Sequence, residues 1–558
     1  MIHLPAVFLA VFWIWSDLIG VLLSVVSTYF YFGWEGAALL VPKIFAIALL
    51  SFSSPAAYRL LLRRFDPDQL QRTLLLLLFF LYLGLAVNRD SDFFAWGTVA
   101  ATWLGGLAMM AVLRSLGRYP VWSMPLYSLV LSLFFYMATR VSQAGVPLLL
   151  SSPQKLGLTA WGTLGVFVLA GIFLPQRRAA APEVQPLPAS AGSLGLVFGL
   201  LTGLSLGLAT NLHLWSAQTD PVPDAAYFLP LAIGALTGWL AYRHGQSRRP
   251  LLIVAATCTL GAALVPLLYT GYDLLLGQLA CTGAAAGIFT LWAFFLGRWR
   301  AYLRQDPEFF PWLGLQGGFV GLLLILAVFL LKANPGGFWL ALLGSGGLLL
   351  WHELRNPSQE LGSTVLDRLW QYSCGVFALM GLGVLLLPVP AIQAQPPAGP
   401  ITVMTSNIRY GWTDDYRFDP FLHPRWLKTR LPAIMGLEEV NKGHTSGAYS
   451  DLFRLYQKLL PGRWLYGDAH FGFGNALFTR YEVLGHEVRT YQARDMLKRS
   501  CLITTLRIEN QPVDVFVTHL SHLDPPNPVR EAQAAELAGW LGQSRHPWIL
   551  LGDFNATP

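Results

Sequence analysis

The chain has 558 residues, of which 54% are hydrophobic and only 12% are charged. Soluble globular proteins carry about 25% charged residues, so this composition excludes an ordinary soluble protein as the whole chain and indicates a membrane protein. The formal net charge is +7, but the part from Pro400 onward holds 17 Lys and Arg against 16 Asp and Glu, which argues against a nucleic-acid-binding module.

From about Leu4 to Pro388, runs of apolar residues alternate with short polar breaks. Each run has roughly the twenty residues that an α-helix needs to cross the hydrocarbon core of a bilayer. We count about thirteen runs and predict an α-helical transmembrane domain over residues 1–388. The clearest runs are Thr73–Val87, Ala95–Leu113, Ala191–Leu212, Leu251–Leu268, Phe310–Leu331 and Cys374–Leu387.

The first run, Pro5–Phe32, lacks a preceding Lys or Arg and a cleavage site, so we interpret it as a span and not as a signal peptide. It contains Asp17. A carboxylate at that depth is costly and is a candidate for function. The alternative, which we favour, is that Asp17 caps a helix or pairs with a neighbouring span.

Basic residues gather in every second loop of this region, as in the group Arg243, Arg248 and Arg249, whereas intervening loops hold acidic residues such as Asp220 and Asp224. Positive residues remain on the cytoplasmic side of short loops. We therefore predict an integral multi-pass protein of the plasma or inner membrane, with a cytoplasmic N-terminus. The part that follows the last span is then extracytoplasmic.

A proline-rich linker is predicted over residues 389–400, within "PVPAIQAQPPAGP". Such proline density cannot continue a helix and forms a semi-rigid extended spacer. After it the pattern changes to short apolar runs bounded by turns, which is typical of strands.

Four of these apolar runs, within "ITVMTSN", "AIMGLEE", "VDVFVTH" and "WILLGDFN", end in polar residues. Polar side chains just past buried strands stand at the edge of a sheet. The residues in question are Asn407, Glu438, Glu439, His519, Asp553 and Asn555.

The chemistry of this set is consistent. Oxygen donors without thiolates suit Mg²⁺ or Mn²⁺, and a magnesium site uses one or two carboxylates and leaves the other positions to water and substrate phosphate. A histidine beside such a metal can protonate a phosphoryl oxygen, and amides can orient water. The residues therefore indicate metal-assisted hydrolysis of a phosphoester.

The motifs of residues 401–558 resemble the endonuclease/exonuclease/phosphatase (DNase I-like) superfamily. They stand in the family's order: "TSNIRYG", "IMGLEEVNKG", "GNALFTRY", "VTHLSH" and "LLGDFNATP". The resemblance implies an α/β four-layer β-sandwich domain. The expected fold class of the chain is therefore a membrane-spanning α-helical bundle followed in sequence by an α/β four-layer β-sandwich.

The resemblance also implies roles for individual residues. Asn407 and Glu439 would hold the metal, with Glu438 in the place of the family's usual glutamine. Asn475 would contact the scissile phosphate, and His519 would stabilise or protonate phosphoryl oxygens. Asp553 would orient or deprotonate the attacking water, and Asn555 would help to hold the transition state. We interpret three polar residues near these motifs as surface or structural groups: His522, Arg480 and Arg530.

Family members continue past Gly-Asp-Phe-Asn for several strands and end in an Asp-His pair, whereas this chain stops at Pro558. We therefore expect a domain that is incomplete at its C-terminus, and a chain that is inactive or nearly so as it stands.

The leading hypothesis is a membrane-anchored, metal-dependent phosphodiesterase or phosphatase that acts outside the cytoplasm on a lipid-linked or headgroup phosphoester. Its partners would be the lipid bilayer and the phosphoester substrate. One alternative is an extracytoplasmic nuclease, which the near-neutral charge does not favour. Another is a non-catalytic domain that binds a phosphorylated ligand on a lipid-handling membrane protein. The sequence leaves the substrate open.

Overall fold

The computed structural model describes residues 60–87, 91–117, 228–244, 249–269, 274–305, 336–355 and most of 399–556, with short stretches within 7–21, 57–58, 165–169 and 197–204. The chain divides into two compact units, and residues 388–558 belong to the second. Of the predicted linker, only residues 399 and 400 are among those described.

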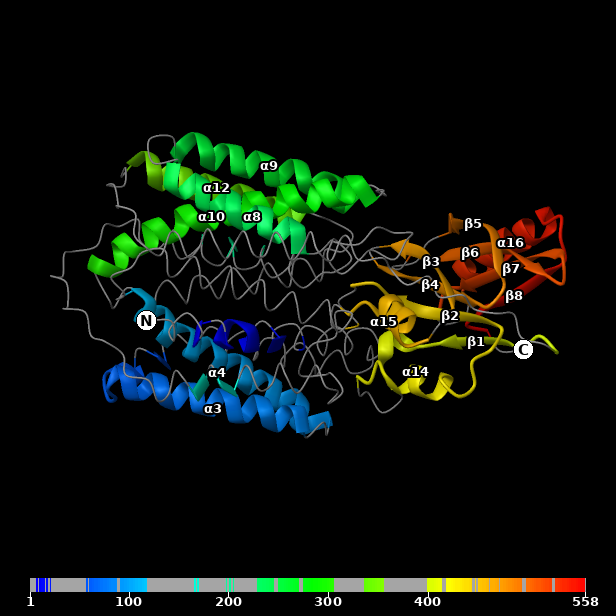
Figure 1. The fold of residues 1–558 in the computed structure, drawn as a ribbon, viewed down its shortest axis with the longest axis horizontal. Coiled ribbons are helices and arrows are strands. Elements are labelled where there is room, and N and C mark those ends of the chain that lie inside the picture. The colour runs from blue at the N-terminus through cyan, green and yellow to red at the C-terminus, as the bar shows by residue number, and fades with distance from the viewer. Residues whose placement is uncertain are drawn as a thin grey trace. The chain divides into compact units, whose positions relative to one another are not determined.

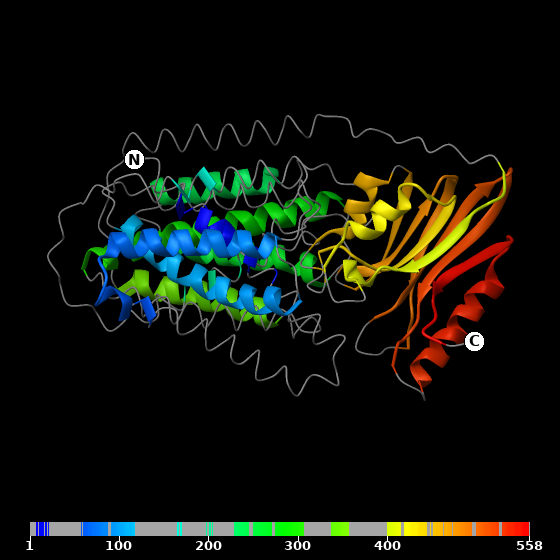
Figure 2. The same cartoon turned by 90° about the horizontal axis from the view of Figure 1, so that it is seen from below.

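The described part of the first unit consists of helices (Figures 1 and 2). They are α3 (Pro67–Val87), α4 (Ser91–Gly117), α8 (Phe228–His244), α9 (Arg249–Tyr269), α10 (Leu274–Gln305) and α12 (Gly336–Arg355). The predicted runs Thr73–Val87, Ala95–Leu113 and Leu251–Leu268 lie inside α3, α4 and α9. Helix α10 packs against α8 at Gly238, where an added Cβ would lie 2.8 Å from the carbonyl oxygen of Phe289.

Within the described ranges, α3 alone is both long and apolar enough to cross a membrane, by length and composition. Shorter apolar helical stretches lie in α4, α8, α9, α10 and α12. The runs Ala191–Leu212, Phe310–Leu331 and Cys374–Leu387 lie largely or wholly outside the described residues. The count of about thirteen spans therefore stays a prediction.

Asp17 is fully buried and lies against α3. The hydroxyl of Tyr82 on this helix donates to Asp17 Oδ2 at 2.7 Å, and Tyr82 is fully buried too. A buried carboxylate needs such a donor, because an unsatisfied one would be strongly destabilising. This contact between neighbouring helices supports the structural interpretation of Asp17.

The described part of the second unit contains two four-stranded mixed sheets. The first sheet has the order β1-β2-β4-β3 and the second β5-β6-β7-β8. The strands are β1 (Val403–Asn407), β2 (Ile434–Asn441), β3 (Arg463–His470), β4 (Phe473–Thr479), β5 (Glu482–Thr490), β6 (Ser500–Ile508), β7 (Gln511–His519) and β8 (Trp548–Asp553). The pairs β1–β2 and β7–β8 are parallel, and the other neighbours are antiparallel.

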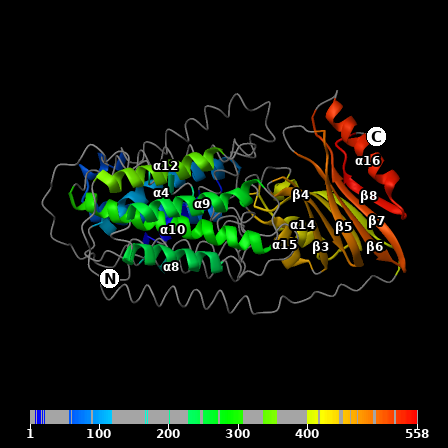
Figure 3. The ribbon, with the colours of Figure 1, turned by 90° about the horizontal axis from the view of Figure 1, so that it is seen from above.

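Helices lie on the outer faces of both sheets, which gives the helix–sheet–sheet–helix layers of the predicted sandwich (Figure 3). Helices α14 (Leu422–Leu427) and α15 (Leu452–Leu459) lie on the first sheet, and α16 (Pro528–Gln543) lies on the second. Asn527 caps α16, since its side chain accepts a hydrogen bond from the backbone N–H of Arg530.

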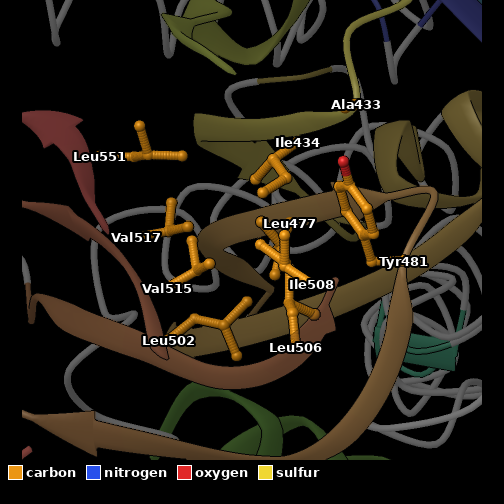
Figure 4. Packing of buried hydrophobic residues seen from close by; sticks show 10 residues of the cluster. All are labelled: Ala433, Ile434, Leu477, Tyr481, Leu502, Leu506, Ile508, Val515, Val517 and Leu551. Atoms are coloured by element: carbon orange, nitrogen blue, oxygen red, sulfur yellow. The ribbon is translucent and has the colours of Figure 1, made fainter. Parts of the chain in front are cut away.

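The core of the sandwich lies between the two sheets (Figure 4). Ile434 and Leu477 of the first sheet pack against residues of the second, among them Leu502 and Val517. Side chains alternate between the two faces of a strand. On β6, Leu502 therefore faces the sandwich core, whereas Ile503 belongs to a second apolar cluster with Leu537 of α16.

Candidate functional site

The polar residues that follow the predicted strands lie at one edge of the sandwich. Because β1 pairs with β2 and β7 pairs with β8 in parallel, the carboxyl ends of each pair lie together. Asn407 is in register with Glu438, and His519 is in register with Asp553. A hydrogen bond of 2.9 Å from Asn407 Nδ2 to Asp553 Oδ2 joins the two sheets.

Strand β2 does not end at Glu438 and Glu439, as the apolar run predicted, but continues to Asn441. The strand register shifts between Leu437 and Val440, so the two glutamates lie in a bulge. Glu439 has a φ of +55°, a left-handed conformation that non-glycine residues adopt rarely. The bulge turns the chain without ending the strand, which is why the sequence pattern misplaced the boundary.

Other residues at this edge also have left-handed backbone: Arg409, Tyr410 and Asn555. Each such residue costs about 1 to 3 kcal/mol, so it persists only where surrounding structure enforces it. Gly552 serves the same edge, because a Cβ there would clash with the carbonyl oxygen of Thr518. The close approach of β8 to β7 places the carboxylate of Asp553 beside His519.

Glu439 is buried, with a relative exposure of 6%. Burial raises its pKa to about 7, although the nearby Arg499 guanidinium and a hydrogen bond from Asn407 act in the opposite direction. Its Oε2 atom is buried and has no hydrogen-bond partner among the described residues. A buried oxygen of this kind is satisfied when a cation or a hydrogen-bond donor lies against it.

Glu438 has a different environment from Glu439. Thr405 Oγ1 donates to its Oε1 atom at 2.7 Å, so the carboxyl group is bonded within the protein. Burial raises the pKa of Glu438 to about 8, which favours the neutral form at pH 7. The two adjacent glutamates are therefore distinct: one is held by a neighbouring strand, and the other presents an unpartnered oxygen.

His519 lies between the two carboxylates that face the site. Its Nε2 atom is 3.7 Å from Asp553 Oδ2 and 4.0 Å from Glu439 Oε1. Burial lowers the pKa of His519 well below its usual value, and the positive charge of Arg499 lowers it further. The imidazole is therefore neutral at pH 7.

Arg499 sets the tautomer of this histidine. Its Nη1 lies 2.7 Å from His519 Nδ1, and its Nη2 lies 2.9 Å from His522 Nδ1. An arginine can only donate, so Nδ1 of each histidine accepts and the neutral ring carries its proton on Nε2. In His519 this is the nitrogen that faces the two carboxylates.

The sequence analysis did not select Arg499, although it is 1% exposed and its guanidinium lies 5.3 Å from the ring of Phe473. The signal that could have found it is its place immediately before β6, the antiparallel neighbour of the strand that ends in His519. His522, which we interpreted as a surface or structural group, binds the same guanidinium. Arg530 donates to the backbone carbonyls of Ser521 and Leu523, as a structural residue would.

Asn555 lies beside His519, with 3.0 Å between its Nδ2 and His519 Nε2, and its Nδ2 donates to the carbonyl oxygen of Leu520. Asn475 is buried on β4, where its Nδ2 donates to the carbonyl oxygen of Ser500 at 2.9 Å. The structure thus joins Asn407, Glu439, His519, Asp553 and Asn555 through short contacts. Asn475 is bonded to the backbone of β6 instead.

The donor set at this edge fits a hard divalent cation. It contains the unpartnered oxygen of Glu439, the amide of Asn407 and the carboxylate of Asp553, and oxygen donors suit Mg²⁺ and Mn²⁺. Within the described part of the chain, no group of three or more His, Cys, Asp and Glu side chains is arranged to hold a metal. A cation here would therefore rely on an amide, water and substrate for its remaining ligands.

Residues 404–558 match the model of the Endonuclease/Exonuclease/phosphatase family. The C-terminal part of the chain therefore carries a DNase I-like domain of this family, as its motifs indicated. No curated protein matches the chain.

Three solved structures that are similar to the chain each cover 28% of it. A humanized D. rerio TDP2 is 16% identical, with 63% of that chain covered and a TM-score of 0.24. A mannosyl-6-phosphatase of Bacteroides thetaiotaomicron is 17% identical, with 67% covered and a TM-score of 0.23. An endonuclease/exonuclease/phosphatase of Bacteroides vulgatus is 19% identical, with 66% covered and a TM-score of 0.25. The chain thus spans less than two thirds of the TDP2 structure.

Proposed function

We propose that the C-terminal domain is a phosphoester hydrolase that uses Mg²⁺ or Mn²⁺. In this proposal the N-terminal part anchors it in a membrane, and the domain acts on the extracytoplasmic side. The observation that carries the proposal is the convergence of Asn407, Glu439, His519 and Asp553 at one edge of the sandwich. The buried carboxylate of Glu439 and the half-buried one of Asp553, beside a neutral histidine, are typical of a catalytic site.

Each residue has a role that its contacts allow. Glu439 and Asn407 would supply oxygen ligands for the cation. When bound there, the cation would neutralise charge on the phosphoryl oxygens and lower the pKa of water. Asp553 would orient and deprotonate the attacking water, and His519 would donate a hydrogen bond from Nε2 to a phosphoryl oxygen. Asn555 would place its uncharged side-chain amide beside the same phosphoryl group.

The proposed substrate is a lipid-linked or headgroup phosphoester. A near-neutral C-terminal part, with 17 basic against 16 acidic residues from Pro400, supports this choice over duplex nucleic acid. Anchoring beside a bilayer would also keep a lipid-borne phosphate at high effective concentration.

Metal binding tests the site directly on the full chain in detergent or lipid nanodiscs. Titration with Mn²⁺, followed by electron paramagnetic resonance, should show one tight site. Glu439→Gln should weaken it by more than about 100-fold, because loss of an outer partner of a ligand already costs about 10- to 100-fold. Glu438→Gln is the matched control, since that neighbouring carboxyl group is bonded to Thr405 and should leave affinity nearly unchanged.

Hydrolysis of phospholipids, bis(p-nitrophenyl) phosphate and DNA by a protein that carries the complete family domain tests the reaction. Phospholipid cleavage that Asp553→Ala abolishes is the expected result. Cleavage of DNA but of no phospholipid would replace the lipid proposal by the nuclease alternative. Tight binding of phosphorylated ligands without turnover would indicate a non-catalytic domain instead.

A further inference from the structure

Helix α14 exposes two large apolar side chains on the outer side of the first sheet. Leu422 is 52% exposed and Trp426 is 47% exposed. They are four residues apart, so they lie on the same face of the helix. The opposite face is buried through Pro424 and Leu427, so this helix is anchored in the domain and presents an apolar face outward.

Basic residues border this apolar pair. Arg430 lies with its guanidinium 5.2 Å from the ring of Trp426, and Lys428 is exposed beside it. Neither of these two basic residues forms an ion pair with any residue that the structure describes. Arg425 is exposed as well, but it pairs with Asp419. The surface therefore combines an exposed indole, an aliphatic side chain and two positive charges.

The surface is held in place from beneath. The ring of His423 stacks on that of Trp426 at 6.2 Å and 14°, and His423 Nδ1 lies 2.9 Å from the hydroxyl of Tyr456 on α15. The backbone before α14 is fixed too, since Asp419 Oδ1 accepts from the N–H of Phe421. These contacts restrict the ring of Trp426, which reduces the conformational entropy that binding would cost.

This combination fits the interface of an anionic bilayer. Tryptophan rings are favoured at the level of lipid headgroups, aliphatic side chains enter the acyl boundary, and Lys and Arg attract anionic lipids. A protein partner fits less well, because the cores of protein interfaces are depleted in lysine. A nucleic acid would use the charges but not the exposed leucine.

We infer that Leu422, Trp426, Lys428 and Arg430, the α14 surface, bind the headgroup layer of an anionic membrane. The inference rests on the proposed membrane anchoring for its choice of partner but not on hydrolysis. Strand β1 links the surface to the candidate site, since Ser406 Oγ lies 3.4 Å from His423 Nε2 and Asn407 is the next residue. Binding would hold the site close to lipid-borne phosphate.

Photo-crosslinking in the full chain tests this surface. Trp426→p-benzoylphenylalanine, in nanodiscs of phosphatidylcholine with and without phosphatidylglycerol, should form a lipid adduct that mass spectrometry detects. The adduct should be several-fold more abundant in the anionic discs. Trp548→p-benzoylphenylalanine is the matched control, because Trp548 is 48% exposed in the same domain, and it should form little adduct. Equal adducts at both positions, or only protein adducts at 426, would overturn the inference.

Charge variants provide the second measurement. Lys428→Gln with Arg430→Gln should weaken the binding of anionic lipid roughly 25-fold, at about fivefold per basic residue, and so remove the excess adduct in anionic discs. Arg545→Gln, an exposed arginine on the same domain, should leave it unchanged. An unchanged adduct in the double variant would refute the electrostatic part. Binding of Mn²⁺ reports the candidate site separately, so its absence would count against the proposed function alone.

Discussion

At the scale of single residues, Arg499 controls the chemistry available to two histidines. A buried guanidinium needs acceptors, and it finds them in the Nδ1 atoms of His519 and His522. The positive charge of Arg499 also opposes protonation of His519. After burial, it is the largest cause of the lowered pKa of His519. One side chain thus keeps the imidazole neutral and directs its N–H toward Asp553 and Glu439.

Arg499→Gln should shift the pH dependence of hydrolysis. The positive charge lowers the pKa of His519, so its removal raises that pKa and His519 becomes protonated at higher pH. If the neutral ring is the active form, the acidic limb of the kcat/KM profile moves to higher pH and activity is lost first in acid. The measurement is kcat/KM against pH for bis(p-nitrophenyl) phosphate, with the protein that carries the complete family domain.

His522→Gln serves as the control for this shift. His522 also lowers the pKa of His519, but it ranks after burial and Arg499 among the causes. This variant keeps the contact between Arg499 and Nδ1 of His519. The acidic limb of the kcat/KM profile should therefore move to higher pH, but by less than in Arg499→Gln. If Arg499→Gln left the pH profile of kcat/KM unchanged, Arg499 would not be the residue that lowers the pKa of His519.

At the scale of elements, Asp514 of β7 attaches the end of α16 to the second sheet. Its carboxylate accepts from Ser544 at 2.6 Å and from Thr505 at 2.7 Å, and His546 Nδ1 lies 3.2 Å away. Ser544 is the C-terminal cap of α16. Burial acts to raise the pKa of Asp514, but these hydrogen bonds outweigh it and lower the pKa below its ordinary value.

This attachment should weaken in acid. Because the folded pKa of Asp514 lies below the unfolded value of about 3.9, its stabilisation is fully present above that value and is lost as pH falls through the folded pKa. Asp514→Asn should cost about 1.5 to 3 kcal/mol at pH 7, the range for hydrogen bonds to a charged group. Hydrogen exchange at the C-terminal end of α16 measures this loss.

Hydrogen exchange of Asp514→Asn and of the unchanged protein at several pH values provides the control. Below the folded pKa both proteins carry a neutral group at position 514, so the difference in protection should shrink as the pH falls through the folded pKa of Asp514. A difference that stayed constant with pH would show that packing, and not the charge of Asp514, holds the helix end.

At the scale of the whole molecule, the two units differ in composition. Residues before Pro400 hold 21 of the 38 Lys and Arg and only 15 of the 31 Asp and Glu, whereas the rest is almost neutral. A basic excess confined to alternate loops is what membrane insertion produces, since positive loops remain in the cytoplasm. We therefore predict that the sandwich domain lies on the opposite side of the membrane from those loops.

Reporter fusions should reveal this sidedness. Alkaline phosphatase, which folds only outside the bacterial cytoplasm, should be active when fused after Pro558 and inactive when fused after Gln246, beside the Arg-rich loop. A cytoplasmic reporter such as green fluorescent protein should give the reverse pattern at the same two positions. Equal activity at both positions would reject the predicted orientation.

The sequence by itself determined the chemical types at the site and most of the strands that present them. Asn407, His519 and Asp553 are the last residues of β1, β7 and β8, as the apolar runs predicted. These signals are local, because a run of buried apolar residues ends where the chain meets polar side chains. The bulge at Glu439 was not predicted, because it depends on how β2 pairs with β4. The sequence of β2 alone does not specify that pairing.

Only the tertiary structure decided which atoms meet. The hydrogen bond between Asn407 and Asp553 joins residues 146 positions apart, and it exists because two separate sheets pack face to face. Packing likewise buries Arg499 against both histidines and leaves Glu439 Oε2 without a partner. Desolvation and mutual distance set the protonation of these groups, and both arise only when remote segments are brought together.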